Sequence, residues 1–137
     1  MTQQNIIHNQ LTLSLKSAPA TSADLTIAQD LRDTLLANKD KAAGLAANMI
    51  GQNKRIIALF IGPLPIVMLN PVITSSSGEY LTQEGCLSLT GQRSTKRFKN
   101  ITIQYQNENL ETHKQEFSDF TAEVIQHEID HCNGILI

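Results

Sequence analysis

The sequence contains no tryptophan, and aromatic residues make up only 4% of its 137 positions. Its 11 basic residues are outnumbered by 13 acidic ones, which gives a formal net charge of −2. Proteins that bind nucleic acid use a basic surface, and those that bind single strands add aromatic side chains for stacking. Because both features are missing, we expect no stable complex with nucleic acid.

The sequence also lacks a long apolar run. Its most apolar stretch, residues 56–69, is interrupted by Gly62, Pro63 and Pro65. A membrane-spanning helix needs about 20 apolar residues without such breaks. The first basic residue is Lys16, and the start of the chain has no apolar core of the kind that a secretory signal requires. We therefore expect a cytoplasmic protein with no membrane segment.

Cysteine is scarce, since only Cys86 and Cys132 are present. In a reducing compartment a cysteine serves as a metal ligand, a nucleophile or a buried apolar residue rather than as half of a disulfide.

Hydrophobic residues make up 41% and charged residues 18% of the chain, and no linker or repeat divides it. A chain of this length and balance predicts a single domain over residues 1–137.

The sequence predicts two helices. Apolar residues at helical spacing, preceded by a capping-box pattern that starts at Thr21, predict a helix over residues 22–38. A second helix is expected to begin at Ser118 or Asp119 and to stop by Gly134, because glycine favours the left-handed conformation that ends helices. The helices thus lie near opposite ends of the chain.

Between the helices the pattern is that of strands. Apolar, β-branched or alternating runs occur at residues 55–61, 66–70, 71–74, 79–81, 101–105 and 111–117. We expect a loop over residues 75–78, which are three serines and a glycine, and a hairpin turn over residues 107–109. This order predicts an α+β fold, with antiparallel β-sheets packed around the C-terminal helix and a further helix near the N-terminus.

The terminal helix contains the sequence QHEIDH at residues 126–131. His127 and His131 are four residues apart, so their imidazoles lie on one helix face and together can bind one ion. Glu128 lies beside this pair and can serve as a general base toward a water on that ion. A solvated helix with two chance histidines is the alternative. Two of only four histidines at this spacing favour a metal site.

A catalytic metal centre of this type needs a third protein ligand and one open position. Cys132 directly follows His131, so it is turned about 100° from the histidine face and is predicted to be buried in the core. Cys86, within EGCLS at residues 84–88, is the stronger candidate. A thiolate with two imidazoles forms a ligand set that suits Zn²⁺ or Fe²⁺.

Taken together, these motifs resemble those of the peptide deformylase family. Residues 84–88 match the family's EGCLS in full, and residues 126–131 match its QHExDH. The segment GLAA at residues 44–47 resembles the second half of its GφGφAAxQ motif. The resemblance implies a deformylase-like fold and removal of the formyl group from the N-terminal formyl-methionine of nascent polypeptides.

The resemblance also implies roles for individual residues. Cys86, His127 and His131 would bind one divalent ion, commonly Fe²⁺ in this family, although Zn²⁺ or Ni²⁺ can occupy such a site. Glu128 would move the proton of the attacking water, and the backbone N–H of Leu87 would help to hold the oxyanion.

The resemblance implies that the substrate is a formyl-methionyl peptide. It also implies that the enzyme is a monomer and that it contacts the ribosome transiently. Gly44 would let the peptide approach closely, and Arg93 matches a position where some members contact the substrate backbone. Arg93 has an equal claim to be a solvated loop charge. An apolar pocket for the methionine side chain is also implied, and candidates for its wall, each equally suited to the core, are Leu45, Ile50, Leu87 and Val124.

Two positions depart from the family's GφGφAAxQ motif, and the first is Ala42, which stands in place of its first glycine. Met49 stands where the family has a glutamine that donates a hydrogen bond to the oxyanion, and a thioether has no proton to donate. Loss of one such donor costs about 10²–10³ in rate, and compensation by Asn48 or Gln52 is less expected than loss. The first alternative is thus a deformylase-like protein that binds metal and formylated peptides with weak or no catalysis. The second is a structural metal domain, with His8 or His113 as fourth ligand.

Overall fold

The computed structural model describes residues 4–86 and 88–136. Its helical elements are α1 (Gln10–Leu13), the 3₁₀ turn η1 (Ser22–Asp24), α2 (Leu25–Ala37), the 3₁₀ turn η2 (Ala47–Ile50) and α3 (Asp119–Cys132). The predicted capping box is confirmed, because the Thr21 backbone N–H donates to Asp24 Oδ2 at 2.8 Å. The predicted first helix therefore begins with one 3₁₀ turn, η1, before α2.

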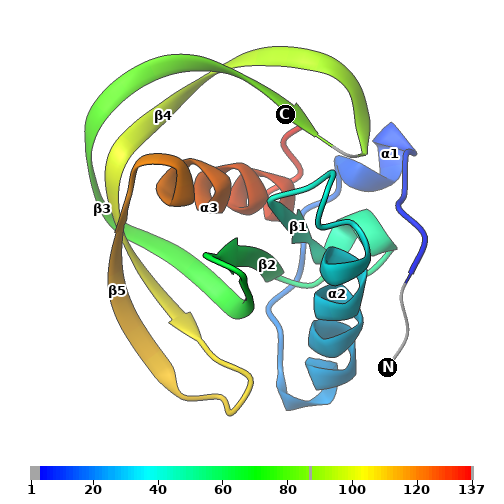
Figure 1. The fold of residues 1–137 in the computed structure, drawn as a ribbon. Helices are drawn as coiled ribbons and strands as arrows, with labels where there is room; N and C mark the ends of the chain where they lie inside the picture. The colour runs from blue at the N-terminus through cyan, green and yellow to red at the C-terminus, as the bar shows by residue number, and fades with distance from the viewer. Residues whose placement is uncertain (1–3, 87, 137) are drawn as a thin grey trace.

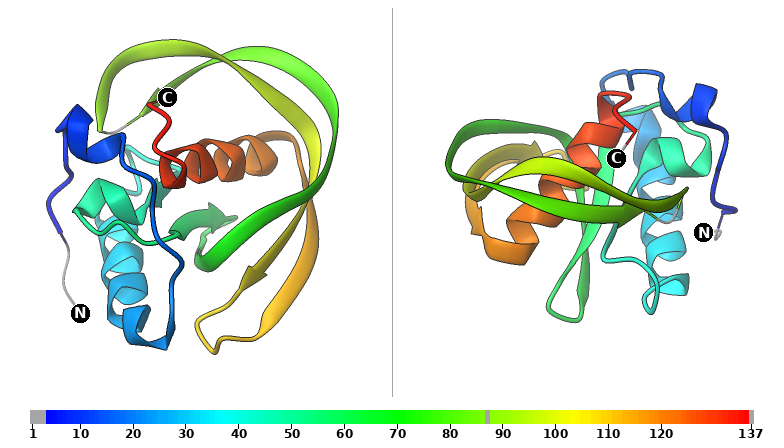
Figure 2. Two further views of the ribbon diagram at one scale, coloured as in Figure 1. Left: turned by 180° about the vertical axis from the view of Figure 1, so that it is seen from behind. Right: turned by 90° about the horizontal axis from the view of Figure 1, so that it is seen from above.

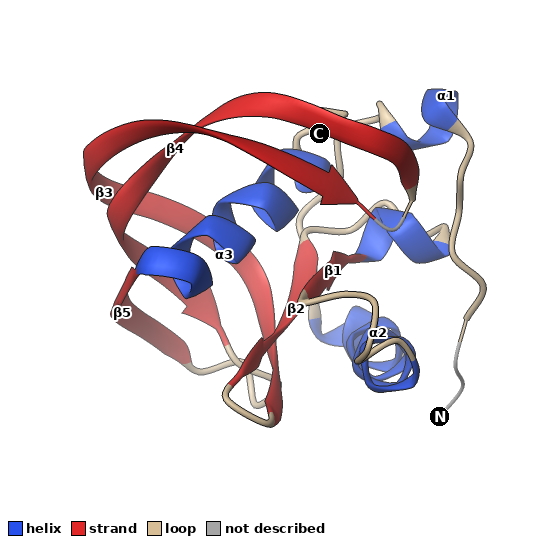
Figure 3. Ribbon diagram, turned by 45° about the horizontal axis from the view of Figure 1, so that its top comes forward, coloured by secondary structure: helices blue, strands red, loops and turns tan. Residues whose placement is uncertain are grey.

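Five antiparallel strands form one sheet in the order β1-β2-β3-β4-β5. They are β1 (Gly44–Ala46), β2 (Ile56–Ile61), β3 (Leu64–Cys86), β4 (Leu89–Gln106) and β5 (Thr112–Ser118). The short β1 and β2 lie between α2 and α3 (Figure 3). The predicted α+β class is confirmed, and a single continuous sheet replaces the separate sheets that the sequence predicted.

The predicted loop over residues 75–78 is wrong, because β3 continues through it. Ser76 pairs with Ile101 and Ser77 with Asn100 in the ladder between β3 and β4. Register shifts near Val72 and Ser75, together with a φ of +78° at Gly78, bend the strand without ending it. The serines are exposed to water, so their polar composition is compatible with a strand.

The bend in β3 and β4 determines where the site is built. The two strands curve around α3, which lies inside the arc (Figures 1 and 2). The far end of β3 is thereby returned to the C-terminal half of α3. Helix α3 also contacts β1 and β2, so segments distant in the sequence meet at this helix.

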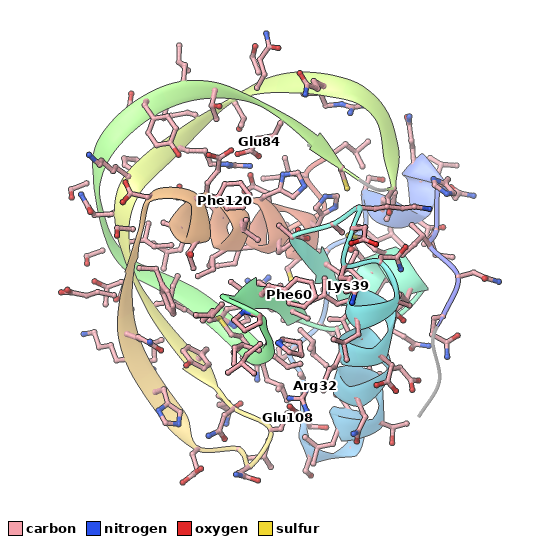
Figure 4. The ribbon with its side chains drawn as sticks, viewed as in Figure 1. Arg32, Lys39, Phe60, Glu84, Glu108 and Phe120 are labelled. Carbon is pink, nitrogen blue, oxygen red and sulfur yellow. The ribbon has the colours of Figure 1, made fainter. Side chains whose placement is uncertain are left out.

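The core lies where α2, α3 and the first two strands meet. Leu31 of α2, Ile57 of β2 and Ile125 of α3 are fully buried. Cys132 is also fully buried, which confirms its predicted place in the core. An ion pair joins Arg32 of α2 to Glu108 in the turn after β4 (Figure 4). No helix within the described residues is long and apolar enough to cross a bilayer.

Helix α3 ends as predicted at a glycine. Gly134 has a φ of +75°, and a Cβ on it would overlap the carbonyl oxygen of Ser14. Gly62 in the turn between β2 and β3 has a similar φ of +60°, but a Cβ on it would meet no other atom within 4 Å. Substitutions at Gly62 and Gly134 therefore distinguish the cost of a positive φ alone from the added cost of close packing.

We expect Gly62→Ala to lower the free energy of unfolding by about 1 kcal/mol, which is the cost of left-handed backbone for alanine. Gly134→Ala is expected to lower it by about 3 kcal/mol, because the overlap with Ser14 adds to the same strain. Urea unfolding of both variants measures the difference. Equal losses in the two variants would contradict the close approach of Gly134 to Ser14.

Candidate metal centre

Three potential metal ligands meet at the inner face of α3. Cys86 Sγ lies 3.2 Å from His131 Nε2, which lies 3.3 Å from His127 Nε2. The ligand atoms of all three residues lie within 4.8 Å of one another. Donors bound at 2.0–2.3 Å to one tetrahedral ion are about 3.5 Å apart, so the spacing and the N₂S chemistry both fit a divalent ion such as Zn²⁺ or Fe²⁺.

The local sequence explains how these side chains come together. The two histidines are one helical turn apart, and Cys86 is the last residue of β3, which the bend returns to α3. Gln126 fixes the helix against β4, since its Nε2 donates to the Phe98 carbonyl and its Oε1 accepts from the Phe98 N–H, both at 2.8 Å. A helix side chain thus takes the place of a neighbouring strand and sets the position of His127.

Glu84 is part of the site, although the motif that contains it predicted no role for this residue. Its Oε1 accepts a hydrogen bond from His127 Nδ1 at 2.8 Å. Arg97 donates to both carboxylate oxygens of Glu84, at 2.9 Å from Nε and 2.7 Å from Nη2, and to Asp130 at 2.7 Å from Nη1. Because Nδ1 of His127 is engaged in this way, its Nε2 is left to face the ligand group.

The charges around His127 shift two pKa values. Burial acts to raise the pKa of Glu84, but hydrogen bonds from His127 and Arg97 outweigh it and bring the pKa down to about 2. Burial acts to lower the pKa of His127, but its contacts with Cys86 and Glu84 raise it to about 10. Glu84 and His127 thus stabilise each other's ionised forms before an ion binds, and a metal ion at Nε2 takes the place of that proton on His127.

Glu128 lies next to the ligands and is 4% exposed. Its Oε1 has no hydrogen-bond partner among the described residues, and burial raises its pKa to about 7. A carboxyl group with this pKa can accept and return a proton near neutral pH. Gly44 passes close to it, since a Cβ on Gly44 would lie 3.2 Å from Glu128 Cγ and 2.7 Å from Val124 Cγ1.

Met49 and its neighbours do not present a side-chain donor to the ligands. Met49 is buried in η2, and its Sδ accepts the Ala46 N–H at 3.3 Å. Asn48 is also buried, and its Nδ2 donates to the His131 carbonyl at 2.8 Å, so it ties η2 to the end of α3. Gln52 is exposed. The structure therefore favours no compensation by Asn48 or Gln52.

Arg93 and Leu87 are the remaining predicted substrate contacts. Arg93 lies on β4, where its backbone is opposite Glu84 of β3 in the strand register. Its side chain is half-buried and is not part of the wall of the cavity described below. Leu87, the predicted backbone donor, lies outside the described residues.

The candidate fourth ligands do not join the group. Among residues 4–86 and 88–136, the one cluster able to hold a metal ion is Cys86 with His127 and His131. His8 is exposed and its Nδ1 donates to the Ser88 carbonyl at 3.0 Å. His113 is exposed on β5, where its ring stacks on another aromatic ring. A site with three protein ligands leaves a position for water or substrate.

A cavity of about 240 Å³ opens beside these ligands. Its wall is formed by Lys41, Ala42, Ala43, Gly44, Gln83, Glu84, Gly85, Cys86, Phe120, Glu123, Val124, His127 and Glu128. Of the residues expected to line an apolar pocket, Val124 does so. Leu45 and Ile50 are buried in the core instead, because β1 and η2 turn them away from the cavity.

Comparison with known proteins agrees with this geometry. The family model for polypeptide deformylase matches residues 5–137. The chain is 48% identical over 132 residues to a peptide deformylase of Clostridium beijerinckii, which covers 96% of this chain and 97% of the relative. It is 36% identical over 135 residues to a peptide deformylase of Chlorobaculum parvum, which covers 90% of this chain and 71% of the relative.

Solved structures show the same similarity. The crystal structure of a class I type b peptide deformylase from Acinetobacter baumannii with Met-Ala-Ser bound has a TM-score of 0.88 and 28% sequence identity. The match covers 99% of this chain and 97% of that one. The family match, the relatives and the Cys-His-His cluster lead to one conclusion: the chain belongs to the polypeptide deformylase family, hydrolases that act on N-formylmethionyl peptides.

Proposed function

We propose that the chain removes the formyl group from the N-terminal formyl-methionine of nascent polypeptides, using one ion, Fe²⁺, held by Cys86, His127 and His131. The observation that carries this proposal is the meeting of these three side chains beside the buried Glu128. An ion bound there supplies Lewis-acid activation of water and of the formyl carbonyl. The soft N₂S donor set supports Fe²⁺ and equally accepts Zn²⁺ or Ni²⁺.

The chain's own residues move the proton and hold the substrate. Glu128 accepts a proton from the attacking water and returns it to the leaving amine, in keeping with its pKa of about 7. In this proposal the Leu87 N–H donates to the oxyanion, while Gly44 gives the peptide a close approach. Arg93 contacts the peptide backbone, a role supported by its place on β4 opposite Glu84.

The peptide in the Acinetobacter structure supports the proposed substrate class. That deformylase binds Met-Ala-Ser, and we infer that this chain binds the same kind of peptide in the cavity beside its ligands. We further propose that the chain acts as a monomer. Its contact with the ribosome would then be transient, through the nascent peptide.

The test is formate release from formyl-Met-Ala-Ser by protein reconstituted with Fe²⁺ without oxygen. We expect steady turnover that a chelator abolishes and that Fe²⁺ restores. Release no greater than that of the Glu128→Ala variant under the same conditions would overturn the proposal.

The position of Met49 supports slower catalysis than an enzyme with the family's glutamine would show. Because its sulfur only accepts, from the Ala46 N–H, Met49→Gln introduces a new donor beside β1. We expect kcat to rise about tenfold, a part of the 10²–10³ that a well-aligned oxyanion donor supplies. Met49→Leu, which changes the packing but adds no donor, serves as the matched control. If Met49→Gln leaves kcat at the wild-type value, the missing donor does not limit the rate.

A further inference from the structure

The wall of the cavity beside the metal ligands carries a carboxyl group on its helical side. Glu123 lies one turn before His127 on α3, and its Oε1 accepts a hydrogen bond from the Tyr80 hydroxyl at 3.2 Å. The Glu123 carboxyl also neighbours that of Glu84. Figure 4 shows Phe120 at the first turn of the same helix, with Glu84 on the strand that passes over it.

The position of Glu123 relative to the reacting atoms follows from the same cavity. The wall that includes Glu123 also includes Gly44, Cys86 and Glu128. A formyl group at the metal ligands therefore places the first side chain of the peptide within reach of this wall. Two other polar residues of the wall, Lys41 and Gln83, are exposed and lie at its rim.

We propose that Glu123 determines specificity at this cavity, by accepting a hydrogen bond from a first side chain that ends in an N–H donor. Glutamine is such a side chain, and its amide nitrogen lies where methionine has its terminal methyl group. The Glu123 carboxyl accepts from the Tyr80 hydroxyl and also contacts Glu84, and its two oxygens retain an accepting lone pair for this bond. This inference rests on the proposed function and extends its substrate class.

The Glu123 carboxylate interacts differently with a methionine side chain and with a glutamine side chain. A methionine side chain displaces water from Glu123 and offers no hydrogen bond in return, which weakens binding. A glutamine side chain replaces the lost water with a donor, so the cavity discriminates less against it than an apolar cavity would. Replacing Glu123 by an apolar residue removes the penalty for methionine and the gain for glutamine.

The experiment compares kcat/KM for formyl-Met-Ala-Ser and formyl-Gln-Ala-Ser in the wild type, Glu123→Leu and Glu123→Gln. We expect Glu123→Leu to shift the methionine-to-glutamine ratio about tenfold or more toward methionine. Glu123→Gln retains an accepting oxygen and is expected to shift the ratio less. Glu116→Gln, which alters an exposed carboxylate on the distant β5, is the matched control and should leave the ratio unchanged.

A second readout is independent of turnover. Calorimetric binding of the deformylated peptides Met-Ala-Ser and Gln-Ala-Ser to each folded variant should give a ratio that shifts in the same direction. Ratios within twofold of the wild type in Glu123→Leu, in both assays, would overturn the role of Glu123. A wild type that releases no formate would instead refute the proposed function, and the binding ratio would still decide whether Glu123 selects the side chain.

Discussion

Replacing Glu128 by glutamine is expected to lower kcat/KM for formyl-Met-Ala-Ser by about 10³, within the range that a positioned general base contributes. Glutamine has the same shape but cannot accept the proton of the attacking water at neutral pH. The carboxyl that it replaces is 4% exposed, and its Oε1 has no hydrogen-bond partner among the described residues. The substitution therefore breaks no hydrogen bond of Oε1 with the described residues, and the fold is expected to remain intact.

Metal content separates loss of the base from loss of the ion. Because Glu128 is not one of the three clustered ligands, the Glu128→Gln variant should bind one ion per chain as the wild type does. The Glu116→Gln variant provides a control for removal of a carboxylate from the surface. A Glu128→Gln enzyme that keeps more than a tenth of the wild-type kcat/KM would rule out Glu128 as the principal base.

Replacing Arg97 by methionine is expected to lower the free energy of unfolding by about 3–5 kcal/mol, the cost of leaving a buried charge without its partner. Arg97 is 3% exposed and donates to both oxygens of Glu84 and to Asp130. Since Glu84 in turn accepts from His127, the same change should weaken metal binding about 10–100-fold. Urea unfolding and metal titration measure the two effects.

The neighbouring Lys96 provides a matched control on the same strand. Its Nζ lies 3.6 Å from Glu79 Oε2, and the two side chains are 57% and 58% exposed. Exposed pairs of this kind contribute about 0–1 kcal/mol, so Lys96→Met should have little effect on stability or metal affinity. If Lys96→Met and Arg97→Met lower the free energy of unfolding and the metal affinity by similar amounts, the burial of Arg97 does not explain its effect.

The metal ligands could be predicted because each lies in a short sequence pattern. The spacing of His127 and His131 determines their common helix face whatever the tertiary structure. Cys86 required the additional expectation that its strand returns to that helix. The need for a third ligand supplied this expectation, the family motifs agreed with it, and the bend of β3 and β4 brings Cys86 to the helix.

Glu84 and Arg97 could not be predicted from local pattern. They are brought together by the pairing of β3 with β4, and their contacts with His127 and Asp130 depend on how far the sheet curves around α3. Within one strand, a buried glutamate and arginine look the same as exposed ones. Both Glu84 and Asp130 lay inside the family motifs, which was the available signal.

The loop wrongly predicted over residues 75–78 has a related cause. Residues 75–78 have the composition of a turn, but their backbone groups find partners along β4. Of the residues expected to line an apolar pocket, Leu45 in β1 and Ile50 in η2 are instead buried in the core. Which face of a short strand meets a cavity depends on contacts that local sequence does not encode.

X-ray absorption spectroscopy of the protein loaded with Zn²⁺ tests the central arrangement most directly. We predict one sulfur at about 2.3 Å, two imidazole nitrogens at about 2.0–2.1 Å and one lighter donor from solvent. The Cys86→Ala variant should lose the sulfur signal and keep the imidazoles. A spectrum without sulfur in the wild type, or one with four protein ligands, would contradict an open site made by Cys86, His127 and His131.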